Sequence, residues 1–176
     1  MKRILAVCLI ALAFTSSCDK KKTLGPSASN LDFTCIRQYD INHNFLGSIG
    51  DVSDEYTQED WPNWVYDLLA PLDSVDLTGY DKADVSITAL YPNPCADTQA
   101  IRLFASKPEN FKVVIIDKNK NVFYLKSMHL FLGDQFKHFD YSGLNMSPGY
   151  YRMYYSASAH NNPHYYRGHI DIWKQY

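Results

Sequence analysis

Five acidic side chains crowd one short segment, and two of them could form the carboxylate pair of a hydrolase. They are Asp51, Asp54, Glu55, Glu59 and Asp60. Glycosidases use one carboxyl as the acid and a second as base or nucleophile, but a run of acids is also typical of a solvated loop. A hydrolase using acidic residues 51–60 therefore ranks last among our hypotheses. The chain has no G-x-S-x-G motif and no free cysteine with an obvious histidine partner.

Metal chemistry has weaker support. Asp117, Asn119 and Asn121 have the one-three-five spacing of calcium loops, but Val and Met replace the Gly and Glu that such loops need further along. A hairpin turn is the favoured interpretation. His160, His164 and His169 are close together in the sequence, but they lack the closer spacing typical of zinc ligands. We expect no metal and no cofactor.

A tyrosine-rich run near the C-terminus is the strongest candidate for a binding surface. Neighbouring residues of a strand point to opposite faces, so one face of this run belongs to the core and the other could expose its rings. Exposed aromatic rows stack on sugars or anchor protein partners, although cross-strand pairs that only stiffen the sheet remain the favoured alternative. The residues are Tyr150, Tyr151, Tyr154, Tyr155, Tyr165 and Tyr166.

The first 17 residues predict an export signal. Lys2 and Arg3 precede an apolar run over 4–14, which would rise only about 16 Å as a helix, too short for a membrane span. The sequence Thr15-Ser16-Ser17-Cys18 resembles the bacterial lipobox, with Thr15 where the commonest form has Leu. We therefore expect a mature chain that begins at a lipidated Cys18 and is anchored in the cell envelope, at the outer membrane. The sequence does not distinguish the periplasmic face of that membrane from its surface face.

Residues 18–30 are predicted to form a flexible tether between the lipid and the fold, because Gly, Pro, Ser and Ala dominate after Lys20–Lys22. Without Lys2 and Arg3 the mature chain has 15 basic and 19 acidic residues, a formal charge of −4. The sequence has no basic patch of the kind that nucleic-acid binding requires, so we expect no nucleic-acid partner. The expected partners are the membrane, through the anchor, and a glycan or an envelope protein.

Two cysteines remain after the signal and the anchor, and an exported protein can join them. A disulfide between Cys35 and Cys95 would close a loop of about 60 residues and stabilise the fold by roughly 4 kcal/mol. Two buried free thiols are the equally weighted alternative.

The elements that must position these residues are mostly strands. Residues 31–39 alternate like a strand, and Phe45-Leu46-Gly47 could pair back on it. Trp61 to Ala70 has helical spacing, with Pro62 near its start and Pro71 after its end. From residue 84 onward, about seven short strands separated by turns predict an Ig-like antiparallel β-sandwich.

Four motifs in this second half occur in a specific order. They are Leu90-Tyr91-Pro92-Asn93-Pro94 with the strand Ile101-Arg102-Leu103, then Lys112 to Asp117, then Met146-Ser147-Pro148-Gly149-Tyr150-Tyr151-Arg152, and finally His169 to Lys174. Together they resemble the type IX secretion (Por) C-terminal sorting domain family of Bacteroidota, over about half of the chain. The resemblance implies a seven-stranded β-sandwich. Asp73-Ser74-Val75 also resembles the O-glycosylation sequon of that phylum, which makes Ser74 a candidate acceptor.

The sequence thus predicts a mainly β protein with four parts: a signal peptide (1–17), a lipid-anchored tether (18–30), a strand and one short helix (31–83), and a β-sandwich (84–176). The absence of catalytic motifs favours a non-enzymatic binding or structural module of the envelope. A type IX sorting-type domain is the alternative that the family resemblance implies.

Overall fold

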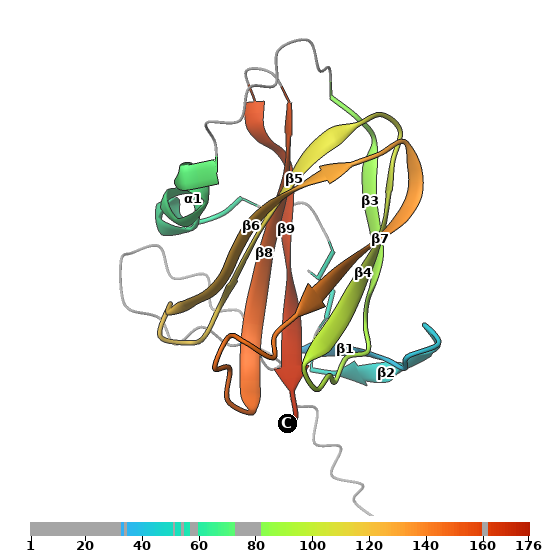
Figure 1. Ribbon diagram of the computed structural model, residues 1–176, viewed down its shortest axis with the longest axis vertical. Helices are drawn as coiled ribbons and strands as arrows, with labels where there is room; N and C mark the ends of the chain where they lie inside the picture. Colours follow the sequence, from blue (N-terminus) through green and yellow to red (C-terminus); the bar gives the residue numbers. More distant parts are fainter. Residues whose placement is uncertain are drawn as a thin grey trace, which may run out of the picture.

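The computed structural model describes residues 33, 35–50, 52–53, 55–56, 60–72, 82–159 and 162–176. In these residues the chain forms nine strands, one α-helix and one short 3₁₀ helix (Figure 1). The elements are β1 (Ile36–Tyr39), β2 (Phe45–Ile49), α1 (Asn63–Leu69), η1 (Ala70–Leu72), β3 (Val85–Tyr91), β4 (Thr98–Ala105), β5 (Glu109–Ile116), β6 (Val122–Leu130), β7 (Gly133–Asp140), β8 (Gly149–Ala159) and β9 (Asn162–Lys174).

Seven of the strands form two facing antiparallel sheets. The three-stranded sheet has the order β3-β4-β7 and the four-stranded sheet the order β6-β5-β8-β9. The chain changes sheet between β4 and β5, between β6 and β7, and between β7 and β8, as in Ig-like sandwiches. Their inner faces share one core, which includes Ile101, Phe111, Tyr155 and Ile170. The predicted β-sandwich is therefore confirmed.

Strand β5 is apolar on both faces because it is covered twice. Val113 and Ile115 point into the sandwich core, whereas Val114 and Ile116 belong to a second cluster beneath α1. This explains why the sequence reads as a continuous apolar run there, without the alternation of a half-exposed strand. In Figure 1, α1 lies beside β6 on the side of the molecule away from β3.

Helix α1 docks through one stripe of side chains. Trp61, two residues before the helix, and Val65 and Leu69 within it recur at four-residue intervals, are buried, and share the cluster of β5. The predicted helix is confirmed, but it begins two residues later than expected. Pro71 lies within η1 and does not follow the helix directly. Within the described residues, no helix combines the length and apolar character needed to cross a membrane.

Two hairpin loops use the same D-x-N-x-N sequence. Asp40 Oδ1 accepts hydrogen bonds from the amides of Asn42 and Asn44 at 2.8 Å, and Asp117 Oδ1 accepts from those of Asn119 and Asn121 at 2.8 and 2.9 Å. The second loop is therefore the expected hairpin turn, with its carboxylate committed to the backbone.

The left-handed position of that turn falls on a lysine. Lys120 has φ 67°, although asparagine adopts this conformation more readily than lysine does. In the first loop His43 takes the equivalent place with φ 68°. Here β1 pairs with β2 as predicted, although β1 covers only the last four residues of the expected strand 31–39.

Candidate functional site

Three of the six predicted surface tyrosines are buried. Tyr151 and Tyr155 lie in the sandwich core, and Tyr154 lies under α1, where the rings of Trp61 and Trp64 meet it edge-on. The strand alternation is as expected, but the second face of β8 is covered by the helix and not by solvent. Tyr151, Tyr154 and Tyr155 therefore cannot form the exposed aromatic row.

Tyr150 is the one member of β8 in this group that stays accessible, with 38% of its surface exposed. Its ring stacks on Trp173, the residue opposite it on β9, at 5.8 Å between centroids. This pair matches the alternative in which aromatic neighbours stiffen the sheet.

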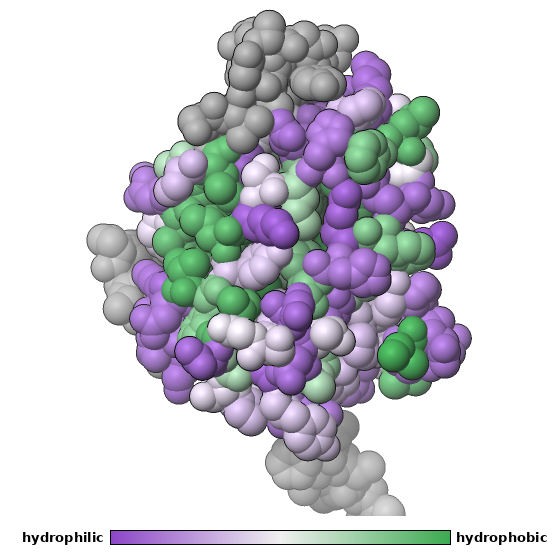
Figure 2. All heavy atoms as spheres, in the orientation of Figure 1, coloured by the Kyte–Doolittle hydropathy of each residue, from purple (hydrophilic) through white to green (hydrophobic). Residues whose placement is uncertain are grey.

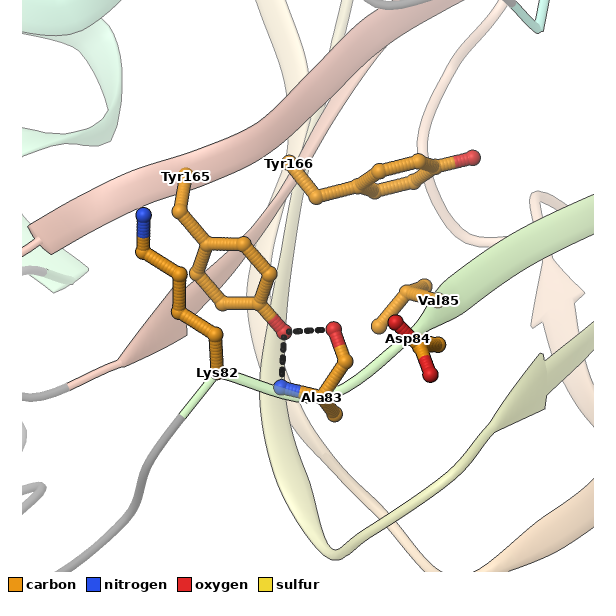
Figure 3. Close-up of a pocket in the computed structure, with 6 residues that line it drawn as sticks. All are labelled: Lys82, Ala83, Asp84, Val85, Tyr165 and Tyr166. Atoms are coloured by element: carbon orange, nitrogen blue, oxygen red, sulfur yellow. Dashed lines mark hydrogen bonds between the residues drawn. The ribbon is translucent and has the colours of Figure 1, made fainter.

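Tyr165 and Tyr166 instead line a cavity of about 440 Å³, a size within the range of small-ligand pockets. They come from the start of β9, and the opposite wall is the stretch that leads into β3 (Figure 3). The remaining lining residues are Lys82, Ala83, Asp84 and Val85. The cavity thus lies between the first residues of two strands that belong to different sheets.

Tyr165 is held rigidly at this site. Its hydroxyl donates to Glu109 Oε2 at 2.6 Å and accepts from the Ala83 amide at 3.1 Å. Figure 3 shows the Tyr165 ring reaching across to Ala83. Burial raises the pKa of Tyr165, and the hydrogen bond to Glu109 raises it further. The phenol therefore stays neutral, and the ring is fixed before any ligand arrives.

Two charged side chains complete the lining. Lys82 Nζ lies 5.8 Å from the centroid of the Tyr165 ring, and the Asp84 carboxylate lies near Val85, below Tyr166 in the view of Figure 3. The cavity therefore combines aromatic rings with a cationic donor and an anionic acceptor. This composition suits a ligand that has both an apolar body and hydroxyl groups.

No motif or spacing in the sequence marks Lys82 and Asp84 as site residues. Both precede the first strand of the sandwich, and the contact between Ala83 and Tyr165 spans 82 positions. Short-range spacing cannot report such a contact. It emerges only when β3 and β9 are placed in facing sheets.

The two described acids of the 51–60 segment, Glu55 and Asp60, have different partners. Glu55 is buried, accepts a hydrogen bond from the Asp171 amide at 2.9 Å and lies 3.5 Å from the Arg37 guanidinium. Asp60 is exposed and forms an ion pair with Arg167. Neither carboxylate lines the cavity. Asp51, Asp54 and Glu59 lie outside the described residues, as do Cys18 and Ser74.

The predicted disulfide between Cys35 and Cys95 is not formed. Cys95 is a free, buried thiol in the sandwich core, where burial raises its pKa to about 12. Its backbone is bound to the end of β9, through Trp173 and Gln175. Cys35 precedes β1 and is not part of that core cluster. The disulfide alternative for this pair was therefore wrong.

The late histidines do not converge. His164 Nδ1 lies 3.1 Å from Ser156 Oγ, and His169 packs near Tyr154, both in buried positions. His160 lies outside the described residues. In the part of the chain that the structure describes, no three His, Cys, Asp or Glu side chains come together as metal ligands.

No family model and no curated protein matches the chain. Solved structures resemble it over 55% of its length. Dimeric latent PorU from Porphyromonas gingivalis is 15% identical, with a TM-score of 0.43, and the match covers 10% of the PorU chain. A β-glucosidase from Listeria innocua, in complex with isofagomine, is 11% identical, with a TM-score of 0.35 over 16% of that enzyme. The similarity is a distant one of β-fold, and the chain spans a small part of each of these proteins.

Proposed function

We propose that the protein is a non-enzymatic, lipid-anchored module of the bacterial cell envelope that binds a carbohydrate in the cavity at Tyr165 and Tyr166. The observation that carries this proposal is the composition of the cavity, in which two tyrosines share about 440 Å³ with Lys82 and Asp84. The anchor at Cys18 and the envelope location rest on the lipobox-like sequence.

A sugar fits this lining better than a purely apolar ligand does. An aromatic ring packs against the C–H face of a sugar, while a carboxylate accepts from hydroxyls and an ammonium donates to them. Asp84 and Lys82 supply these two groups next to the fixed ring of Tyr165. The hydroxyl of Tyr165 is already engaged, so the ring face is its contribution to binding.

The test is a screen of bacterial surface glycans with the mature chain, followed by calorimetric titration of the glycans that bind. Asp84→Asn and Lys82→Ala change exposed side chains and should each weaken binding by about tenfold, the equivalent of one lost charge-assisted hydrogen bond. Tyr165→Phe keeps the ring face but loses the bonds that hold it, and should weaken binding less than either of these variants.

Tyr150→Ala is the matched control, because it removes an accessible tyrosine near the other end of β9. Equal loss of affinity in this control and in the cavity variants would show that the cavity is not the site. Absence of binding to every glycan of the screen would reject the carbohydrate proposal.

A type IX sorting-type domain is the second candidate, and one observation favours it. Two separate family-like motifs meet in the fold: the Asn93 side chain accepts from the Trp173 amide at 3.0 Å, and Lys174 forms an ion pair with Asp97 at 2.8 Å. The first motif and the terminal strand therefore form one structural unit at the end of β9.

This candidate is tested with the unaltered full chain in a Bacteroidota host. Surface display that disappears when the type IX translocon is deleted would support sorting. Display that persists in the deletion strain would reject it. Removing β9 is not a suitable variant, because β9 pairs with β8 along most of its length and its loss would disrupt the sheet.

A further inference from the structure

The hairpin β1–β2 presents an apolar tip to solvent. Ile41, Phe45 and Leu46 are 73%, 58% and 62% exposed. These three side chains form the hairpin tip. Figure 2 shows apolar side chains at the lower right, over the region that β1 and β2 occupy in Figure 1. Ile41 lies in the turn, and Phe45 and Leu46 are the first residues of β2. Large apolar side chains exposed at one end of a hairpin are typical of a contact surface.

The tip has few charged groups around it. Between residues 40 and 49 the only ionisable acid or base besides His43 is Asp40. Its carboxylate accepts hydrogen bonds from Asn42 and Asn44 within the loop, and the bond from the Asn44 side chain is the main cause of its lowered pKa. Asn42 and His43 place polar groups beside the tip, at the level where lipid headgroups would lie.

The hairpin is fixed to the sandwich and cannot fold away. Tyr39 and Asn93 exchange two backbone hydrogen bonds of 2.8 and 2.9 Å. The His43 ring packs against Tyr91 with 3.7 Å between centroids, and also contacts Phe136 at 5.6 Å. The exposed side chains are therefore held outward by contacts to β3 and β7.

The hairpin and the cavity lie at opposite ends of the sandwich. The hairpin is bound at the end of β3, next to Tyr91, whereas the cavity includes Val85, where β3 begins. Val85 and Tyr91 are the two ends of β3, six positions or roughly 20 Å apart. Figure 1 shows the same relationship, with the hairpin low in the view and the start of β3 high.

The expected anchor is close to the hairpin in sequence. Cys18 precedes Ile36 by 18 positions, so the two residues can lie at most about 60 Å apart. Once the lipid is inserted, contact between the hairpin and the bilayer becomes intramolecular, so a small apolar tip is sufficient to orient the module. Lys20, Lys21 and Lys22 in the tether add attraction to anionic headgroups.

We infer that the hairpin tip rests in the interface of the membrane that holds the anchor, and that this contact turns the tyrosine cavity away from the bilayer. The inference rests on the proposed lipid anchor. It adds a second membrane contact, made by protein side chains, and gives the carbohydrate site a defined outward orientation.

The test couples the mature chain through Cys18 to a maleimide lipid in vesicles of phosphatidylethanolamine and phosphatidylglycerol, so that it does not depend on natural acylation. All variants carry Cys35→Ser, so that Cys18 is the reactive thiol outside the core. Cys95 does not compete, because it is buried with a raised pKa. Leu46→Trp places a fluorophore in the tip. Leu132→Trp is the matched control: that leucine is 70% exposed, in the β6–β7 turn at the other end of β4.

Brominated lipids should quench the tryptophan at 46 several-fold more than the one at 132, and Phe45→Asp should abolish the difference. Equal quenching at the two positions would overturn the inference and assign the hairpin tip to a protein partner. Because coupling replaces acylation and no sugar is present, this outcome is distinct from failure of the anchor or of carbohydrate binding.

Discussion

The hydroxyl of Tyr151 donates a hydrogen bond of 2.7 Å to the carbonyl oxygen of Ser147, four residues earlier. This contact closes the loop that carries the chain from one sheet to the other, and it corresponds to the tyrosine corner of Ig-like sandwiches. The ring is buried against Phe123. A residue that the sequence offered as a binding surface is therefore a structural one.

Tyr151→Phe should lower the free energy of unfolding by about 1 kcal/mol, because one hydrogen bond is lost while the ring stays packed. Urea denaturation of the mature chain measures this change. Tyr150→Phe, at an accessible position, should change stability by less than about 0.5 kcal/mol. Equal effects at the two positions would show that the corner contact does not contribute.

Glu55 should make the protein less stable as the pH rises. Burial is the main cause that raises its pKa from 4.5 to about 8, although the Asp171 amide and the Arg37 charge oppose the shift. The folded state then holds a proton that the unfolded state has lost, so stability falls between about pH 4.5 and 8, by at most about 1.4 kcal/mol per pH unit. Above that window the dependence on this group ends.

Denaturation curves of the parent and of Glu55→Gln over this pH range provide the measurement. The variant cannot ionise, so its stability should change less with pH than that of the parent. Parallel curves would contradict the assigned shift.

Asn93→Ala should cost about 2–4 kcal/mol of stability, since several buried groups lose a partner at once. The Asn93 amide donates to the carbonyls of Arg37 and Asp171 at 3.2 and 2.9 Å, and its oxygen accepts from the Trp173 amide. Thermal unfolding compared with Gln175→Ala, an exposed position, measures the effect. A loss no greater than that of the control would mean that the three bonds are dispensable.

Cys95 should resist thiol reagents in the native protein and react once the chain is unfolded, because its pKa is raised and its side chain is buried. Peptide mapping without reduction should yield no fragment that joins Cys35 to Cys95. Such a fragment, or rapid modification of the native protein, would contradict the structure.

Much of the fold could be predicted because its signals are local. Turn residues and alternating strands indicated the sandwich, and the four-residue spacing of Trp61, Val65 and Leu69 indicated the helix. The sequence could not show where that helix docks. Its position over Val114 and Tyr154 depends on contacts between distant segments, and this placement decided which tyrosines are buried.

The site was only partly predictable for the same reason. Tyr165 and Tyr166 stood out by their type, but Lys82 and Asp84 become their neighbours only when the two sheets pack face to face. The D-x-N-x-N spacing illustrates a different limit. The same side-chain pattern serves calcium or a turn, and Asp117 is committed to the turn by its hydrogen bonds to Asn119 and Asn121.

The central claim, that the cavity at Tyr165 and Tyr166 binds a carbohydrate, is tested most directly by NMR of the mature chain with a glycan selected by the screen. The account predicts intermolecular NOEs between sugar protons and the two tyrosine rings, with shift changes at Lys82 and Asp84. NOEs confined to Tyr150 and Trp173, with the cavity unperturbed, would contradict it.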